Sequence, residues 1–151
     1  MDAPQPGPRF RRLEPEEALA LLQRNHVGRL AYARGGRVDI EPLHYVYDEG
    51  WLYGRTSEGT KIEATGKEWW PVAFEVDEIE SMFEWRSVVV QGGFYVLKED
   101  DPRQEDLRAF AIERLRSLVP ATLTVGDPTP DRTLVFRISV QDIEGREATS
   151  G

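Results

Sequence analysis

The sequence predicts an antiparallel β-barrel with helices packed against its outside. Two observations lead to this prediction. Apolar and polar residues alternate in six segments, most of which are joined by short turns containing glycine or acidic residues. Two further segments repeat apolar residues at helical spacing, and each begins near a proline that suits the first turn of a helix. Strands linked mainly by hairpins favour an antiparallel barrel, and the helices are left to cover it.

Composition narrows the class of protein. A chain of 151 residues favours a single domain, and 40% hydrophobic residues are typical of a globular one. The chain has no cysteine, and its two histidines, His26 and His44, are too few for a histidine-built metal site. A net charge of −8 argues against a nucleic-acid partner. No signal peptide or membrane-spanning run of roughly 20 apolar residues is recognisable, so we expect a cytoplasmic protein without a membrane partner.

The domain organisation is expected to be simple. Residues 1–12, rich in proline, are predicted to form a flexible tail, and residues 147–151 a short second tail. The folded domain would then cover residues 13–146. Within it, the six expected strands cover residues 27–34, 38–47, 51–56, 71–77, 87–97 and 133–143. The acidic stretch 75–84 is interpreted as a solvated strand end and loop.

Two helices flank these strands. The first is expected from Pro15 to about Asn25, because its first turn is acidic and leucines form one apolar face. The second is expected to begin after Asp101, whose side chain can cap it. Pro120 cannot continue a helix and would end it.

The second strand changes phase at Pro42. Apolar residues occupy even positions before the proline, Val38 and Ile40, and odd positions after it, Leu43 and Tyr45. A one-residue change of phase at a proline predicts a β-bulge. Such a bulge would mark either a barrel corner or the neighbourhood of a binding site.

The third strand leads into a stretch suited to an anion. Arg55 offers a planar guanidinium and Lys61 a point charge, the two kinds of cation that hold phosphate. Nearby hydroxyl groups could donate further hydrogen bonds, and Thr60 could cap a short helix whose N–H groups face the same anion. Taken alone, the stretch favours the end of a hairpin with ordinary surface charges, because it contains no Walker-type loop and no GxGxxG motif.

The order and spacing of several short motifs resemble one protein family. The matching segments are Val27-Gly28-Arg29-Leu30-Ala31, Glu41-Pro42-Leu43-His44-Tyr45, Leu52-Tyr53-Gly54-Arg55-Thr56 with Lys61, Val72-Ala73-Phe74-Glu75-Val76-Asp77, Trp85-Arg86-Ser87-Val88-Val89-Val90-Gln91-Gly92, Arg137-Ile138 and Gly145-Arg146. Together they resemble the FMN-binding split-barrel proteins related to pyridoxamine 5′-phosphate oxidase, in the branch that includes nitroimidazole-resistance proteins. The resemblance implies a six-stranded antiparallel split β-barrel with flanking helices.

The same resemblance implies a site and a partner. Proteins of this family bind FMN at the interface of a homodimer. By this resemblance, the phosphate would be bound by Arg55, Thr56 and Lys61. The flavin ring would lie along Glu41, Pro42 and Leu43. The facing subunit would contribute Trp85, Ser87 and Val88. Trp85 suits interface packing and flavin contact equally well, and His44 is interpreted as a barrel histidine rather than a proton donor.

The expected function is that of an FMN-dependent oxidoreductase acting on a small molecule that the sequence does not identify. Two departures from the family limit it. The region from Arg55 to Glu58 lacks the histidine of nitroimidazole-resistance proteins, and the chain lacks the basic C-terminal segment of pyridoxamine-phosphate oxidases. Alternatives are an F420-dependent reductase, a non-catalytic flavin- or haem-binding sensor or carrier, and a cofactor-free interaction module. No metal is expected.

Overall fold

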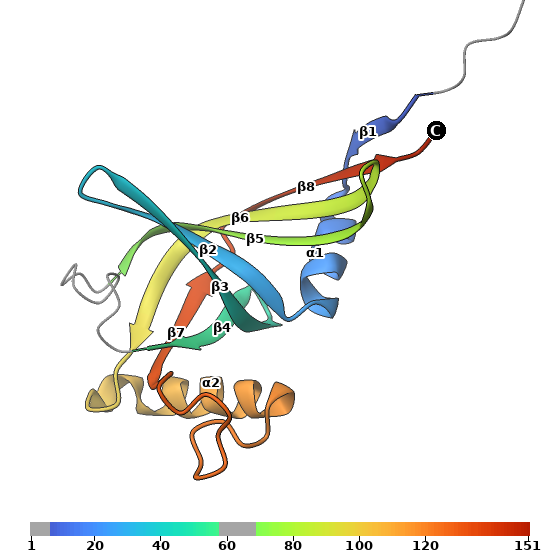
Figure 1. The fold of residues 1–151 in the computed structure, drawn as a ribbon. Helices are drawn as coiled ribbons and strands as arrows, with labels where there is room; N and C mark the ends of the chain where they lie inside the picture. The colour runs from blue at the N-terminus through green and yellow to red at the C-terminus, as the bar shows by residue number, and fades with distance from the viewer. Residues whose placement is uncertain (1–6, 58–68) are drawn as a thin grey trace, which may run out of the picture.

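A single antiparallel sheet of eight strands organises the molecule (Figure 1). The computed structural model describes residues 7–57 and 69–151. The strands are β1 (Arg9–Arg12), β2 (Val27–Arg34), β3 (Arg37–Asp48), β4 (Trp51–Thr56), β5 (Trp69–Ser81), β6 (Glu84–Leu97), β7 (Leu134–Ser139) and β8 (Asp142–Thr149). The helices are α1 (Pro15–Arg24) and α2 (Glu105–Leu118), the latter preceded by a 3₁₀ turn at Pro102–Gln104.

Six of these strands close into a ring. Their order is β6-β5-β2-β3-β4-β7, and β7 pairs back onto β6. Strand β6 changes partner along its length: its first half, Trp85–Gln91, pairs with β8, and its last part, Phe94–Leu97, pairs with β7. The predicted antiparallel barrel is therefore confirmed, and β8 and β1 extend the sheet beyond the ring.

The core lies in two parts. Inside the barrel, Tyr45, Phe74, Phe94 and Phe136 are fully buried, and the rings of Phe94 and Phe136 stack with centroids 4.6 Å apart. The apolar face of α1 closes this core, and the Tyr45 hydroxyl donates to the Leu22 carbonyl at 2.7 Å. A second cluster packs beneath α2; it consists of Val46, Tyr53, Leu97, Ala111, Leu115 and Val135.

Both ends of the described chain are strands. The residues predicted as tails include Arg9–Arg12, which form β1, and residues 147–149, which end β8. These two strands pair with each other, from Arg9 with Thr149 to Arg12 with Arg146. All four residues of β1 are exposed, so buried and exposed side chains do not alternate along it. This strand is therefore recognisable only from its pairing with β8.

Two predicted boundaries also differ. The single strand expected over residues 133–143 is broken at Val140–Gln141, where the chain passes from the edge of β4 to the edge of β6: Val140 N donates to Gly50 O, and Gln141 N to Gln91 O. The acidic stretch expected to be partly loop continues β5 to Ser81, because β6 pairs with it along this length. The predicted spans of α1 and α2 agree with the structure to within a few residues.

Candidate functional site

The outer face of β3 is unusually apolar for an exposed surface. The even-numbered residues Val38, Ile40, Pro42 and His44 point outward and are exposed, with Val38 at 75% and Ile40 at 66%. The odd-numbered residues from Leu43 onward enter the core. His44 therefore stands on this outer face and not inside the barrel, which corrects the interpretation from sequence.

The predicted bulge at Pro42 is absent from the β2–β3 ladder. Pairing runs without a shift from Val27 with His44 to Arg34 with Arg37, and it includes Arg29 with Pro42. The prediction was wrong because it took every apolar residue to be buried. The alternation never changes phase; instead, the outer face of the strand carries apolar side chains that are exposed in the described part of the chain.

A free strand edge accompanies this face. Strand β3 pairs with β4 only from Tyr45 to Asp48, whereas it pairs with β2 from Arg37 to His44. Among the described strands, the segment around Pro42 therefore has a neighbour on one side only. Within residues 7–57 and 69–151, no strand pairs with the backbone groups on the open side, which leaves them to be bound by a ligand. A flat molecule lying there would meet both an apolar wall and backbone hydrogen-bonding groups.

The three residues predicted to line the ring do not point the same way. Pro42 faces outward, whereas Leu43 is buried in the core. Glu41 is half-buried on the inner side, and its Oε1 has no hydrogen-bond partner among the described residues. Burial raises the pKa of the Glu41 carboxyl, an effect that Arg132 partly offsets. Through its side chain only Pro42 can touch a ligand on the outer face; the other two can do so through their backbone.

The residues predicted to hold phosphate lie at the end of β4 and beyond it. Arg55 and Thr56 are both buried, on opposite faces of the strand. The Arg55 guanidinium donates to Asp127 Oδ1 at 2.7 Å and to Thr129 Oγ1 at 2.9 Å. This contact holds the pKa of Asp127 below its usual range. Lys61 lies outside the described residues, so the structure does not place the predicted cluster as a whole.

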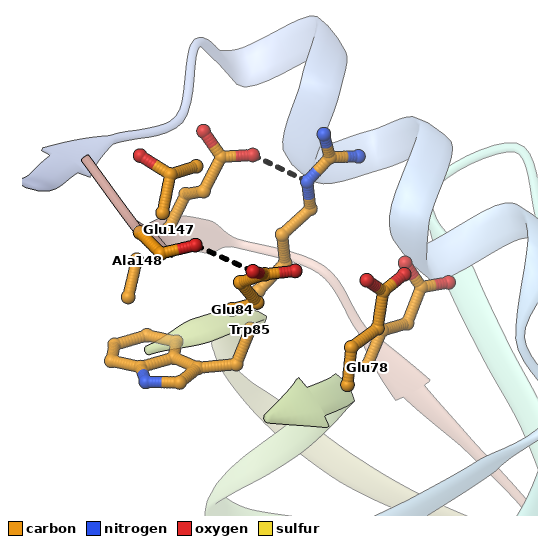
Figure 2. Close-up of a pocket in the computed structure, with 9 residues that line it drawn as sticks. Glu78, Glu84, Trp85, Glu147 and Ala148 are labelled. Carbon is orange, nitrogen blue, oxygen red and sulfur yellow. Dashed lines mark hydrogen bonds and ion pairs between the residues drawn. The ribbon is translucent and has the colours of Figure 1, made fainter. Parts of the chain in front are cut away.

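The third predicted group lies on β6. Trp85 and Ser87 are half-buried at outward positions, and Val88 is fully buried. The Trp85 ring lies 6.3 Å from the ring of Phe10 on β1. Trp85 also lines an open pocket of about 440 Å³ beside the β5–β6 turn, where the carboxylates of Glu78 and several other acidic residues gather (Figure 2).

One chain does not bring β3 and β6 together. Across the outer face, Pro42 pairs with Arg29, Arg29 with Glu75, and Glu75 with Val89. Three strand spacings, about 14 Å, thus separate the two strands, and Trp85 lies further still along β6. A site built from both groups needs a second copy of the chain or a ligand that spans this distance.

Charged groups occupy the middle of this face, and the sequence did not single them out. Arg29 Nη1 lies 2.8 Å from Glu75 Oε1 and 3.4 Å from Asp77 Oδ2. Burial, reinforced by the neighbouring Asp77, raises the pKa of Glu75 to about 7, although Arg29 opposes this. The signal that could have found them is their position: each is a charged residue that alternates with buried apolar residues along its strand.

Within residues 7–57 and 69–151, no three histidine or carboxylate side chains are grouped closely enough to hold a metal ion. The helices of that same part of the chain include none that is long and apolar enough to cross a membrane.

Comparison with solved structures identifies close matches to the fold. An FAD-binding protein from Mesorhizobium loti is 31% identical, with a TM-score of 0.72, and the match covers 93% of this chain and 99% of that one. A protein of unknown function from Corynebacterium diphtheriae is 27% identical, with a TM-score of 0.66 over 93% of this chain and 98% of that one.

A nitroimidazole-resistance protein homologue from Bacteroides thetaiotaomicron shares the fold at 14% identity, with a TM-score of 0.65 over 95% of this chain and 90% of the other. No curated protein matches the chain significantly. A family profile described as pyridoxamine 5′-phosphate oxidase matches residues 14–147, nearly the whole described chain. The FAD-binding protein from Mesorhizobium loti shares the split-barrel fold of this chain. The chain therefore belongs to the pyridoxamine 5′-phosphate oxidase family.

Proposed function

We propose that the protein is an FMN-binding flavoprotein that acts as a flavin-dependent oxidoreductase. The observation that carries the proposal is the outer face of β3, where an open strand edge runs beside exposed apolar side chains centred on Pro42. An isoalloxazine ring presents an apolar surface and a hydrogen-bonding edge, so it matches both features. Family membership and the FAD-binding relative from Mesorhizobium loti support a flavin over other flat ligands.

When bound, a flavin supplies reversible hydride or electron transfer, and the protein determines where that chemistry occurs. The backbone of Glu41, Pro42 and Leu43 would orient the ring along the open edge. Lys61 would bind the phosphate. Arg55 already donates to Asp127 and Thr129, so a phosphate would compete with these partners for its guanidinium. Its contribution would include holding the segment around Asp127 beside the end of β4.

The proposed site is shared by two chains of a homodimer. Trp85 and Ser87 are too far from Pro42 to complete the same site within one chain, but their outward positions suit contact with a ligand held by a partner. There the indole of Trp85 would cover the ring and exclude water, and Val88 would contribute only its backbone because its side chain is buried.

Two measurements test this proposal. The protein as purified, or after incubation with FMN, should show flavin absorption, and titration should give tighter binding of FMN than of FAD. We expect this order because the chain offers one phosphate-binding stretch and no dinucleotide fingerprint. Equal or tighter binding of FAD would reject the choice of FMN, and absence of binding to either flavin would reject the proposal.

Turnover needs a separate test. Under anaerobic conditions, NADH or NADPH should bleach the absorption of the bound flavin, and an added electron acceptor should restore it. A flavin that stays oxidised with both donors, in protein that binds FMN tightly, would favour a carrier or sensor over an oxidoreductase.

A further inference from the structure

Two hairpin tips carry much of the exposed apolar surface. We call residues 34–40, around the β2–β3 turn, the basic tip, and residues 78–85, around the β5–β6 turn, the acidic tip. Val38 and Ile40 are exposed on the first, and Ile79 and Met82 on the second, with Met82 at 79%. Large apolar side chains gathered at exposed turns mark contact surfaces more often than ordinary solvated loops.

The charges of the two tips are opposite. The basic tip carries Arg34 and Arg37 beside its apolar residues, and its one acidic residue, Asp39, lies 3.1 Å from Arg37 Nε through its Oδ1, so Arg34 is the arginine for which the tip itself supplies no carboxylate contact among the described residues. The acidic tip carries Glu80 and Glu84, both exposed, together with Glu78. Glu78 is already bound within the chain, since Arg24 Nη2 lies 2.6 Å from its Oε1.

The acidic tip also contains a receptacle for a cation. The pocket beside it, of about 440 Å³, is lined by the acidic residues Glu78, Glu80, Glu84 and Glu147, and Trp85 borders it, although its indole points away from these carboxylates (Figure 2). A guanidinium can donate two parallel hydrogen bonds to a carboxylate, so this acidic lining suits an arginine side chain. Arg86 and Arg11 already neutralise Glu147 in the pocket wall. Glu84 Oε1 accepts a hydrogen bond from the neutral Ser150 hydroxyl, so among the described residues Glu80 and Glu84 are the pocket's acidic groups without a cationic partner.

The topology places the tips at opposite ends of one sheet. Strands β2 and β5 are antiparallel neighbours, and each runs toward its own hairpin turn, so the two turns must point in opposite directions. Figure 1 shows them projecting on opposite sides of the barrel. A two-fold axis midway between the tips, parallel to the sheet and perpendicular to its strands, brings each tip of one chain onto the other kind of tip in its partner. One rotation thus makes both contacts.

We propose that the basic tip of one chain docks against the acidic tip of a second copy, and reciprocally, with Arg34 or Arg37 entering the pocket beside Trp85. The inference rests on the homodimer proposed above but not on the identity of its cofactor. It adds the contact that selects the partner and sets its orientation. Apolar residues on both tips provide burial, and the opposite charges disfavour pairing of like tips.

Charge reversal tests this contact, because the two-fold symmetry makes a specific rescue possible. Arg34→Glu/Arg37→Glu and Glu80→Arg/Glu84→Arg should each weaken dimerisation by about tenfold or more, since each homodimer then contains two like-charged contacts. An equimolar mixture of the two variants should form a heterodimer of near wild-type affinity, because both of its contacts are again complementary. Sedimentation velocity at low micromolar concentration measures all three samples.

A matched control separates local from overall charge effects. Glu105→Arg/Glu113→Arg makes the same change in net charge as Glu80→Arg/Glu84→Arg, but on α2, away from both tips, and should leave dimerisation unchanged. The rescue also guards against misfolding, because two damaged chains would not regain affinity on mixing.

The outcomes distinguish this inference from the proposed function. A wild-type dimer that neither charge reversal weakens, or variants that do not rescue each other, would overturn the docking of the tips and leave the homodimer standing. A wild-type protein that remains monomeric at every concentration would overturn both. Flavin binding is measured independently by titration, so its presence or absence does not affect this result.

Discussion

The environment of Glu75 on the outer face of the sheet makes the stability of the protein depend on pH. Its pKa is raised from 4.5 to about 7, chiefly by burial. The folded chain therefore binds this proton more tightly than the unfolded chain does. The stability that results is fully present below about pH 4.5 and is lost as the pH rises through 7.

Replacing Glu75 by glutamine should remove this dependence, because the amide resembles the protonated carboxyl at every pH. We expect the free energy of unfolding of the wild type to fall between about pH 5 and pH 8, and that of Glu75→Gln to fall less over the same interval. Urea unfolding of both proteins at the two pH values measures these free energies. Glu113→Gln, on the exposed side of α2, is the control; parallel pH profiles for all three proteins would contradict the assignment.

Lys61 supplies a residue-scale test of the phosphate site. A charge-assisted contact contributes roughly 1.5–3 kcal/mol, so Lys61→Ala should weaken FMN binding about tenfold or more. Riboflavin, which has no phosphate, should bind the variant almost as well as it binds the wild type. Fluorescence titration with both ligands measures the difference. Equal losses for FMN and riboflavin would mean that Lys61 acts on the fold or on the ring.

At the scale of the element, β6 depends on glycine where it changes partner. A Cβ added at Gly92 would lie 1.6 Å from the carbonyl oxygen of Ser139, a backbone atom that cannot move without shifting the end of β7. Gly92→Ala should therefore destabilise the protein by about 1–3 kcal/mol or more, which corresponds to several degrees in Tm. Thermal unfolding followed by circular dichroism measures this loss.

The control for this prediction is Gly126→Ala. A Cβ there would have only the Cβ of Ala121, at 4.0 Å, within reach, so we expect little change in Tm. A Gly92→Ala variant as stable as Gly126→Ala would show that the end of β7 adjusts freely, and that β6 does not need glycine to exchange one neighbour for another.

The elements were largely predictable because local patterns determine them. Alternation located β2 to β7, and the proline and capping signals located α1 and α2. The failures were at pairings between distant parts of the chain. Strand β1 exists because it lies against β8, and the sequence Arg9-Phe10-Arg11-Arg12 contains no alternation of its own. Likewise, apolar Val38 and Ile40 were assumed to be buried, although exposure depends on what covers a strand.

The candidate site was harder to predict than the fold for the same reason. Sequence spacing cannot show that β3 pairs with β4 only from Tyr45 onward. The unpaired strand edge beside Pro42 could therefore not be predicted. Nor could it show that Arg55 meets Asp127, a residue 72 positions away in the chain. Residue types could indicate that Arg55 binds an anion. They could not show whether that anion is a ligand's phosphate or a carboxylate of the same chain, because only the tertiary structure decides between the two.

At the scale of the whole molecule, a cofactor shared by two chains links ligand binding to assembly. If FMN contacts both chains, it must tighten the dimer by the same factor by which dimerisation tightens FMN. Sedimentation at low micromolar concentration with and without FMN should therefore show a larger dimer fraction in its presence. Trp85→Ala should weaken both FMN binding and the dimerisation of the FMN-free chain, whereas Lys61→Ala should weaken FMN binding and leave the dimerisation of the FMN-free chain unchanged.

This linkage has a clear contrary outcome. A monomer that binds FMN with the affinity of the wild-type dimer would rule out the shared site. Trp85, which is half-buried beside Phe10, would then be a packing residue at the end of the sheet.

The closure of the ring has a consequence for synthesis. Strand β4 is complete at Thr56, but its second neighbour begins only at Leu134, and the same late strand closes the ring onto β6. In a chain that is still being synthesised, the edges of β4 and β6 that pair with β7 therefore stay unpaired until β7 has left the ribosomal exit tunnel. Open edges of this kind attract other chains, so this protein is most exposed to aggregation before its synthesis is complete.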